Sequence, residues 1–164
     1  MKVFGFAGWS GSGKTTLIEQ LIPRFVLKGI SVSLIKHAHH EFDIDSPGKD
    51  SYRHRHAGCT EVMVTSDMRW ALMHELRSEP EHALEQQIER MTPVDLLLVE
   101  GWKTQPIPKL EVYRKANGKP FLHPEDGHII AIASDVAAET KLPRFAIDDY
   151  DRIAQFVLES AGLK

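Results

Sequence analysis

A glycine-rich segment near the N-terminus restricts the fold of this chain more than any other part of the sequence. Residues Gly8 to Thr15, GWSGSGKT, fit the pattern G-x-x-x-x-G-K-[ST] in full. The apolar run Lys2 to Ala7 before them is typical of a buried parallel strand, and apolar residues recur at helical spacing from Thr15 to Phe25. A strand, a glycine loop and a helix in this order direct backbone N–H groups and the positive end of a helix dipole toward one point. The sequence therefore predicts a phosphate-binding loop.

The polar residues of this loop have predicted contacts. Lys14 is expected to reach the β and γ phosphates of a nucleotide, and the Thr15 hydroxyl is placed to bind a magnesium ion. The predicted nucleotide-binding residues of the loop are Gly11, Ser12, Gly13, Lys14, Thr15 and Thr16. A glycine-rich turn without a ligand is the alternative for the same residues.

Two carboxylates are candidates for holding the metal ion, besides Thr15. Glu100 follows the apolar run 94–99, which is typical of a strand buried on both faces, so it lies where a phosphate-binding loop needs a carboxylate. The alternative for Glu100 is an exposed ion pair with Lys103. Asp45, in a polar loop after the second predicted strand, is the other metal candidate and a candidate catalytic residue. An Asx turn before Pro47 explains Asp45 nearly as well.

Asp135 is the candidate for recognising the base of the nucleotide. It follows the apolar run His128 to Ala133, so it is expected at the carboxyl end of a late strand, where a carboxylate can accept hydrogen bonds from guanine. The usual Asn-Lys-x-Asp signal of guanine recognition is absent, and Ser134 or Asp135 could instead cap the segment that follows. The sequence leaves both interpretations open.

The stretch from residue 37 to residue 56 is rich in histidine and basic residues. Its histidines are His37, His39, His40, His54 and His56. Their spacing resembles no structural zinc motif, so a solvated cluster and a metal site remain alternatives. In the helix predicted over residues 49–57, Lys49, Arg53 and His56 fall on one face, which makes a basic stripe for a phosphate-bearing ligand or an acidic partner. A solvated helix face is the alternative.

Strands and helices alternate along the rest of the chain. We expect strands over residues 31–35, 110–113 and 144–147, helices over 78–91 and 150–161, and a hairpin at a sheet edge from runs 61–65 and 69–76. This order predicts an α/β fold of the P-loop NTPase class, with a mostly parallel twisted sheet, helices on both faces and a β-hairpin extension. The length of 164 residues predicts one nucleotide-binding domain, residues 1–164.

Composition argues against several classes of protein. With 20 basic and 23 acidic residues the formal charge is -3, so no global positive field exists to bind nucleic acid or an anionic membrane. The longest apolar run, Ile129 to Ala133, is far shorter than a membrane span. The one cysteine, Cys59, cannot form an internal disulfide, and no secretory pattern precedes the first strand. We therefore expect a cytoplasmic protein without a nucleic-acid or membrane partner.

Several short segments, spread over almost the whole chain, together resemble a known protein family. They are residues 8–16, 36–37, 42–45, 47–51, 53–58, 69–76 and 100–103. Within them, Asp-x-Pro-Gly-Lys-Asp-Ser from Asp45 and Glu-Gly-Trp-Lys from Glu100 are more specific than the phosphate loop. In this order the segments resemble the molybdopterin-guanine dinucleotide biosynthesis adapter family, MobB. The resemblance implies a homodimer that binds GTP with Mg²⁺, hydrolyses GTP weakly and partners the guanylyltransferase that attaches GMP to molybdopterin. Molybdopterin itself is a further candidate partner.

The expected function is thus a GTP-binding adapter that is at most a slow GTPase. No arginine stands in an obvious finger position, and phosphate-loop GTPases without one turn over at roughly 10⁻⁴ to 10⁻² per second. A small-molecule kinase and a metallochaperone GTPase that uses the histidine-rich stretch are the alternatives. Trp70 and Leu72 of the hairpin are the predicted dimer or partner contact, with core packing as their alternative.

Overall fold

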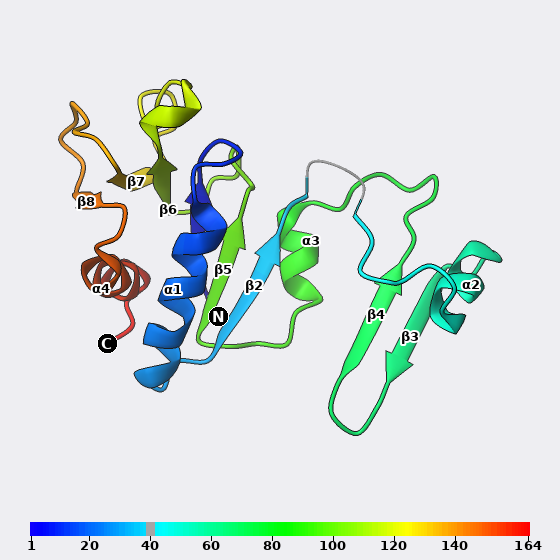
Figure 1. The fold of residues 1–164 in the computed structure, drawn as a ribbon. Coiled ribbons are helices and arrows are strands. Elements are labelled where there is room, and N and C mark those ends of the chain that lie inside the picture. The colour runs from blue at the N-terminus through cyan, green and yellow to red at the C-terminus, as the bar shows by residue number, and fades with distance from the viewer. Residues whose placement is uncertain (39–41) are drawn as a thin grey trace. The chain divides into compact units, whose positions relative to one another are not determined.

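A computed structural model of the protein describes residues 1–38 and 42–164 (Figure 1). The predicted histidines His39 and His40 lie outside the described residues. The chain divides into two compact units, one of residues 1–37 and 87–164 and the other of residues 38–86. That both act as one domain stays a prediction.

The first unit is built on a six-stranded sheet whose described pairings are all parallel. Its strands are β1 (Lys2–Ala7), β2 (Val32–Lys36), β5 (Leu96–Glu100), β6 (Lys109–Tyr113), β7 (Ile129–Ser134) and β8 (Arg144–Ala146), in the spatial order β2-β5-β1-β6-β7-β8. The chain leaves β1 toward β2 on one side of the sheet and later passes to β6 on the other side. The carboxyl end of β1 is therefore the switch point, where open α/β sheets bind ligands.

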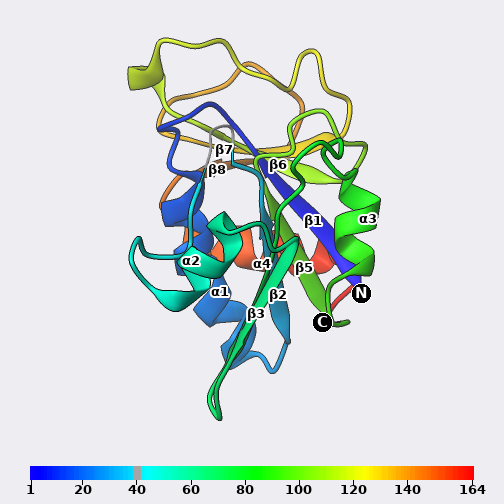
Figure 2. The ribbon, with the colours of Figure 1, turned by 90° about the vertical axis from the view of Figure 1, so that its right-hand side faces the viewer.

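Helices cover both faces of this sheet, which explains its apolar central strands. Residues Leu96 to Val99 of β5 are at most 1% exposed. The helices α1 (Lys14–Leu27) and α4 (Tyr150–Ala161) pack against each other, and Figure 2 shows α1 and the short α3 (Leu84–Glu89) on opposite sides of the sheet. The core side chains of the two longer helices are Leu17, Ile18, Leu21, Phe25, Ile153, Ala154, Val157 and Leu158. The α/β fold with a mostly parallel sheet and helices on both faces is confirmed.

The second unit contains α2 (Asp50–His56) and the hairpin of β3 (Glu61–Thr65) and β4 (Trp70–His74). The strands pair antiparallel from Glu61 opposite His74 to Thr65 opposite Trp70, as the alternating pattern predicts. Their predicted place at a sheet edge is wrong, because β3 and β4 pair only with each other among the described residues.

The predicted helix over residues 78–91 is shorter than expected. Helix α3 begins at Leu84, where the Gln86 side chain accepts a hydrogen bond from the Ala83 N–H at 2.9 Å, half of a capping box. The acidic residues before it do not start the helix, because Pro80 disfavours helical backbone at Glu79.

Candidate functional site

The phosphate-binding loop lies between β1 and α1, as predicted. Gly8, Gly11 and Gly13 all have positive φ, and a Cβ on Gly8 would lie 2.4 Å from the Val112 carbonyl oxygen, so only glycine fits there. The Lys14 ammonium folds back across the loop and donates hydrogen bonds to the carbonyl oxygens of Gly8 and Trp9, both at 3.0 Å. The loop thus carries a lysine ammonium at the start of a helix.

The surroundings of Lys14 are cationic although the chain is acidic. Burial lowers the pKa of Lys14 below its ordinary value, the charge of Glu100 opposes this, and Lys103 and Lys36 lower the pKa further. Positive charge gathered in one place favours an anionic ligand, which a formal charge of -3 over the chain does not exclude.

Thr15 and Glu100 form a pair of oxygen donors beside the loop. The Thr15 hydroxyl donates to Glu100 Oε1 at 2.7 Å, and Glu100 is only 5% exposed. Sheet register explains the meeting, since Glu100 lies opposite Phe6 of β1 on one side and Lys36 of β2 on the other. A hydroxyl and a carboxylate are hard oxygen ligands of the kind that Mg²⁺ takes together with substrate phosphates, so this pair fits a magnesium ion.

A lysine contacts both of these donors. Lys36 Nζ lies 3.3 Å from Thr15 Oγ1 and 3.6 Å from Glu100 Oε2. Lys103, the alternative ion-pair partner of Glu100, instead has its ammonium 4.4 Å from the centre of the Trp9 ring. The sequence analysis missed Lys36, whose position at the end of β2 was its only signal.

Ser12 and Thr16, both predicted to contact phosphate, differ in exposure. Ser12 is 1% exposed, its N–H donates to the Trp9 carbonyl at 3.1 Å, and its hydroxyl has no hydrogen-bond partner among the described residues. Thr16 is exposed in the first turn of α1. Their phosphate contacts stay predictions.

A segment that the sequence analysis did not single out lies against the loop. It begins at Arg114, continues through the 3₁₀ helix η1 (Lys115–Asn117) and turns at Gly118, which has left-handed backbone. The Asn117 side chain donates to the Ser10 carbonyl oxygen at 3.1 Å. A Cβ on Gly13 would lie 3.1 Å from Arg114 Nε, so the guanidinium lies directly beside the loop.

The base-recognition candidate Asp135 is exposed at the carboxyl end of β7. One of its oxygens, Oδ1, accepts a hydrogen bond from the Lys115 N–H at 2.9 Å, while the Ser134 hydroxyl accepts one from the Val136 N–H at 3.1 Å. Ser134 therefore caps the turn after β7, which is part of the alternative to base recognition.

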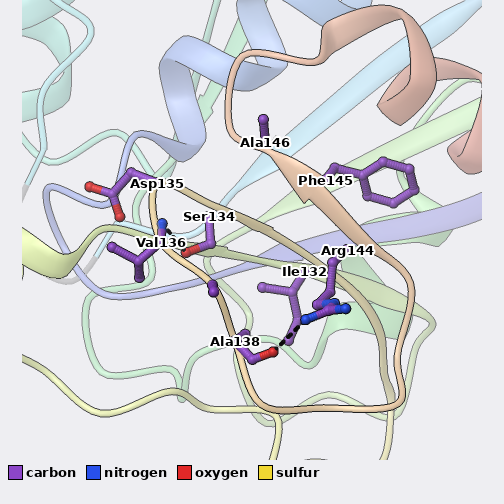
Figure 3. Close-up of a pocket in the computed structure, with 9 residues that line it drawn as sticks. Ile132, Ser134, Asp135, Val136, Ala138, Arg144, Phe145 and Ala146 are labelled. Atoms are coloured by element: carbon purple, nitrogen blue, oxygen red, sulfur yellow. Dashed lines mark hydrogen bonds between the residues drawn. The ribbon is translucent and has the colours of Figure 1, made fainter.

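A pocket of about 410 Å³ lies between the end of β7 and β8 (Figure 3). Its lining residues are Ile132, Ser134, Asp135, Val136, Ala137, Ala138, Arg144, Phe145 and Ala146. Figure 3 shows the Asp135 carboxylate at one end, directed away from Arg144, whose guanidinium donates to the Ala138 carbonyl oxygen at 2.9 Å. The volume is within the range of small-molecule sites.

In the second unit, Asp45 belongs to a hydrogen-bonded turn. Its Oδ1 accepts hydrogen bonds from the Ser46 N–H at 3.0 Å and the Ser51 hydroxyl at 2.9 Å. Its Oδ2 is buried without a hydrogen-bond partner, 3.9 Å from Arg55 Nε. These contacts give Asp45 a structural role, and its metal and catalytic roles stay predictions.

Arg55 is the most strongly paired residue of this unit, which its sequence position did not indicate. It donates to both carboxylate oxygens of Asp43, at 2.8 and 2.7 Å, and to Glu75 Oε1 at 2.6 Å. The hydrogen bonds from Arg55 hold the pKa of Asp43 below its ordinary value. Arg55 therefore ties α2 to the polar loop before it and to the end of β4.

The predicted basic stripe of Lys49, Arg53 and His56 runs along α2. Lys49 immediately precedes the helix, Arg53 Nη1 lies 3.8 Å from Asp50 Oδ1, and the His56 ring stacks on Tyr52 at 3.8 Å. A groove of about 780 Å³ along the helix is lined by Asp50, Tyr52, Arg53, His54, His56 and Ala57. Arg53 and His56 thus line one surface.

Comparison with known proteins adds the family. The family model of molybdopterin guanine dinucleotide synthesis protein B, MobB, matches residues 3–135. The chain belongs to the MobB family. The resemblance noted from its sequence is thereby confirmed.

Individual members of the MobB family are similar to this chain over most of its length. The molybdopterin-guanine dinucleotide biosynthesis adapter protein of Escherichia coli (strain K12) is 44% identical over 160 residues, 96% of this chain and 91% of the relative. The protein of the same name from Haemophilus influenzae is 42% identical over 157 residues, 94% and 86% of the two chains. A crystal structure of molybdopterin-guanine biosynthesis protein B (mobB) superposes with a TM-score of 0.78 at 25% identity, covering 98% of this chain and 99% of that one.

Two findings bear on the alternatives to a MobB function. In residues 1–38 and 42–164, no group of three or more His, Cys, Asp or Glu side chains could hold a metal ion. The His37 ring instead lies 4.8 Å from the Trp102 ring. Membership of the MobB family likewise favours neither the kinase nor the metallochaperone.

No helix in the described part of the chain is long and apolar enough to cross a membrane.

Proposed function

We propose that this chain is a cytoplasmic adapter of molybdopterin guanine dinucleotide biosynthesis that binds GTP with Mg²⁺ and assists the attachment of GMP to molybdopterin. The observation that carries the proposal is the 2.7 Å contact between Thr15 and Glu100 beside a complete phosphate-binding loop, in a chain of the MobB family. At most it is a slow GTPase.

Each residue of the loop has a role in this proposal. The backbone of residues 11–16 surrounds the phosphates, and the Lys14 ammonium exchanges its two carbonyl contacts for phosphate oxygens. Thr15 and Glu100 hold the magnesium ion, with Asp45 as a further candidate. When bound, Mg²⁺ neutralises phosphate charge and orients the β and γ phosphates.

Asp135 is the proposed reader of guanine. Its exposed carboxylate lies at the carboxyl end of β7, beside a pocket of about 410 Å³. Oδ1 accepts the Lys115 N–H, and Oδ2 has no hydrogen bond from any described residue. A carboxylate can accept hydrogen bonds from the N1–H and the exocyclic amine of guanine, whereas adenine presents an acceptor at N1.

Calorimetric titration of GTP and, separately, of ATP in the presence of Mg²⁺ tests the nucleotide proposal. We expect GTP to bind more tightly and Lys14→Ala to abolish the binding. Asp135→Asn keeps an oxygen for the Lys115 N–H but replaces the other oxygen by a donor, so it should lose the preference for GTP and gain affinity for XTP, whose base carries an oxygen at that position. Preference of the wild type for ATP, with ADP formed only when an acceptor is added, would instead support the kinase.

The partner proposed for this adapter is the guanylyltransferase that transfers GMP, and molybdopterin is a second candidate ligand. Lys49, Arg53 and His56 are the proposed contacts, because Arg53 and His56 line one groove along α2 and a basic surface attracts phosphate or acidic side chains. Replacing Lys49 and Arg53 by glutamine should weaken co-elution with the guanylyltransferase while GTP affinity is unchanged. Equal co-elution would remove α2 from the interface.

A homodimer through the hairpin is the proposed assembly. The hairpin exposes large apolar side chains, with Met68 at 80%, Trp70 at 65% and Met63 at 59% exposure. The two strands pair only with each other in the part of the chain that the structure describes, and an apolar hairpin of this kind favours association with a second copy of the chain.

A further inference from the structure

We propose that Arg114 binds the phosphate groups of the nucleotide, as a second cation beside Lys14 that this chain supplies to its own loop. The inference rests on the proposed function, in that it needs a polyphosphate at the loop, but it does not depend on which base that polyphosphate carries.

The sheet places Arg114 at the loop. Arg114 directly follows β6, which pairs in parallel with β1 so that Ala7 lies opposite Glu111. The strands therefore end at the same edge, one leading into the phosphate-binding loop and the other into Arg114. The guanidinium lies against Gly13, the N-cap of α1, with Nε, Nη2 and Cζ at 3.1, 3.3 and 3.7 Å from the position of an added Cβ.

The charge of Arg114 has no carboxylate partner within the part of the chain that the structure describes. The residue is half-buried, and its guanidinium offers five N–H donors and no acceptor. Two other arginines, in contrast, have carboxylate partners: Arg24 Nε lies 2.6 Å from Asp151 Oδ1, and Arg55 binds Asp43 and Glu75. A planar guanidinium beside a loop of converging N–H groups matches the oxygens of a phosphate better than any neighbour it has in this structure.

The segment that carries Arg114 is already held in place. Asp135 Oδ1 accepts the Lys115 N–H at 2.9 Å, Asn117 donates to the Ser10 carbonyl at 3.1 Å, and the Trp9 indole N–H donates to the Pro120 carbonyl at 2.8 Å. Two of these contacts are made to the loop itself. Because backbone position is fixed before a ligand arrives, little ordering of the backbone opposes the contact.

Titration with inorganic tripolyphosphate and with GTP, in the presence of Mg²⁺, tests the proposal on the full chain. Arg114→Gln keeps most of the side-chain volume against Gly13 but removes the charge. We expect it to weaken both ligands roughly 10- to 100-fold, the usual effect of losing a charged hydrogen bond. Arg114→Lys should recover part of the affinity. Lys28→Gln, which removes one charge at the other end of α1, should bind both ligands as the wild type does.

The possible results separate this inference from the proposed function. Wild-type affinity of Arg114→Gln for tripolyphosphate would overturn the role of Arg114 and leave GTP binding intact. Preference of the wild type for ATP, with a loss in Arg114→Gln, would overturn the guanine assignment and support Arg114. No binding of tripolyphosphate or either nucleotide by the wild type would overturn both. If Arg114→Gln unfolds below the assay temperature, Arg114→Met decides, because it also removes the charge while keeping an unbranched side chain, and wild-type affinity there would overturn the role of Arg114.

Discussion

Gly13 has left-handed backbone and also lies directly beside the Arg114 guanidinium. Its φ is +93°, and any side chain there would meet the guanidinium. Gly13→Ala should therefore cost about 1 to 2 kcal/mol of stability for the left-handed backbone and should also displace Arg114. We expect a lower melting temperature and at least a tenfold loss of tripolyphosphate affinity, measured by calorimetry.

Gly29 is the matched control for this substitution. Its φ is +77° and an added Cβ would meet no atom within 4 Å. Gly29→Ala should lose similar stability but retain wild-type affinity. Equal affinities in the two variants would show that the space beside Gly13 does not matter for binding.

At single positions, a residue's role can be predicted from the sequence when the role depends on the spacing of its near neighbours in the chain. Lys14 and Thr15 follow from the loop pattern, and Glu100 follows from its place after a buried strand, so their meeting was predictable. Lys36, Arg55 and Arg114 act through contacts with residues distant in the chain, for which no local pattern exists. The sequence offered no arginine in a finger position because β6 gives no sign that it ends beside the loop.

At the scale of elements, β6 carries two buried charges on one face. Lys109 and Glu111 are both 0% exposed and lie two residues apart on the strand. The Glu111 carboxylate accepts hydrogen bonds from the N–H groups of Leu122 at 2.6 Å and His123 at 3.0 Å. Glu111→Ala would leave these donors without their acceptor and should lower the free energy of unfolding by about 2 to 4 kcal/mol. Urea denaturation measures this, with exposed Glu19→Ala expected within about 0.5 kcal/mol of the wild type.

Lys109 forms an ion pair with Asp126, and this carboxylate makes the stability of the fold depend on pH. Burial by itself would raise the pKa of Asp126, but hydrogen bonds from Lys109 and from the His128 N–H outweigh it and hold the pKa below its ordinary value of 3.8. The unfolded chain therefore binds this proton more readily, so the stabilising effect is present above about pH 4 and is lost as the pH falls through the lowered value.

Asp126→Asn tests this pH dependence. The variant should be less stable than the wild type at pH 7 but should lose less stability between pH 5 and pH 3, since contributions of all other carboxylates cancel in the comparison. Urea denaturation at several pH values measures both losses, and parallel curves would contradict the assignment.

Whole elements were predictable to different degrees. The ranges of β1 and α4 match their apolar patterns, because β1 is buried on both faces from Phe4 to Ala7 and α4 buries one continuous face in the core. Helix α3 did not match, since Pro80 and the Gln86 cap outweigh the acidic start signal. The hairpin was predicted as a pair of strands, but strand alternation does not indicate which sheet a hairpin joins.

On the scale of the whole molecule, the hairpin determines the expected assembly. Trp70→Glu places a charge on its exposed apolar surface and should convert the proposed dimer to a monomer in light scattering. Leu27→Glu is the control, because Leu27 is 87% exposed on α1, outside the hairpin, and should leave the mass unchanged. A Trp70→Glu variant with the wild-type mass would remove the hairpin from the interface.

Lys36 has a consequence for how magnesium reaches the site. Its ammonium contacts both Thr15 and Glu100, so the protein supplies its own counter-ion to the oxygen atoms proposed to hold the metal. A divalent ion that binds there must displace the Lys36 ammonium from the carboxylate, so its binding free energy is smaller than at a carboxylate without a cationic neighbour. Free magnesium should therefore bind weakly, and the ion should enter as the complex it already forms with the nucleotide. Loading is then governed by the supply of nucleotide rather than by the concentration of the metal.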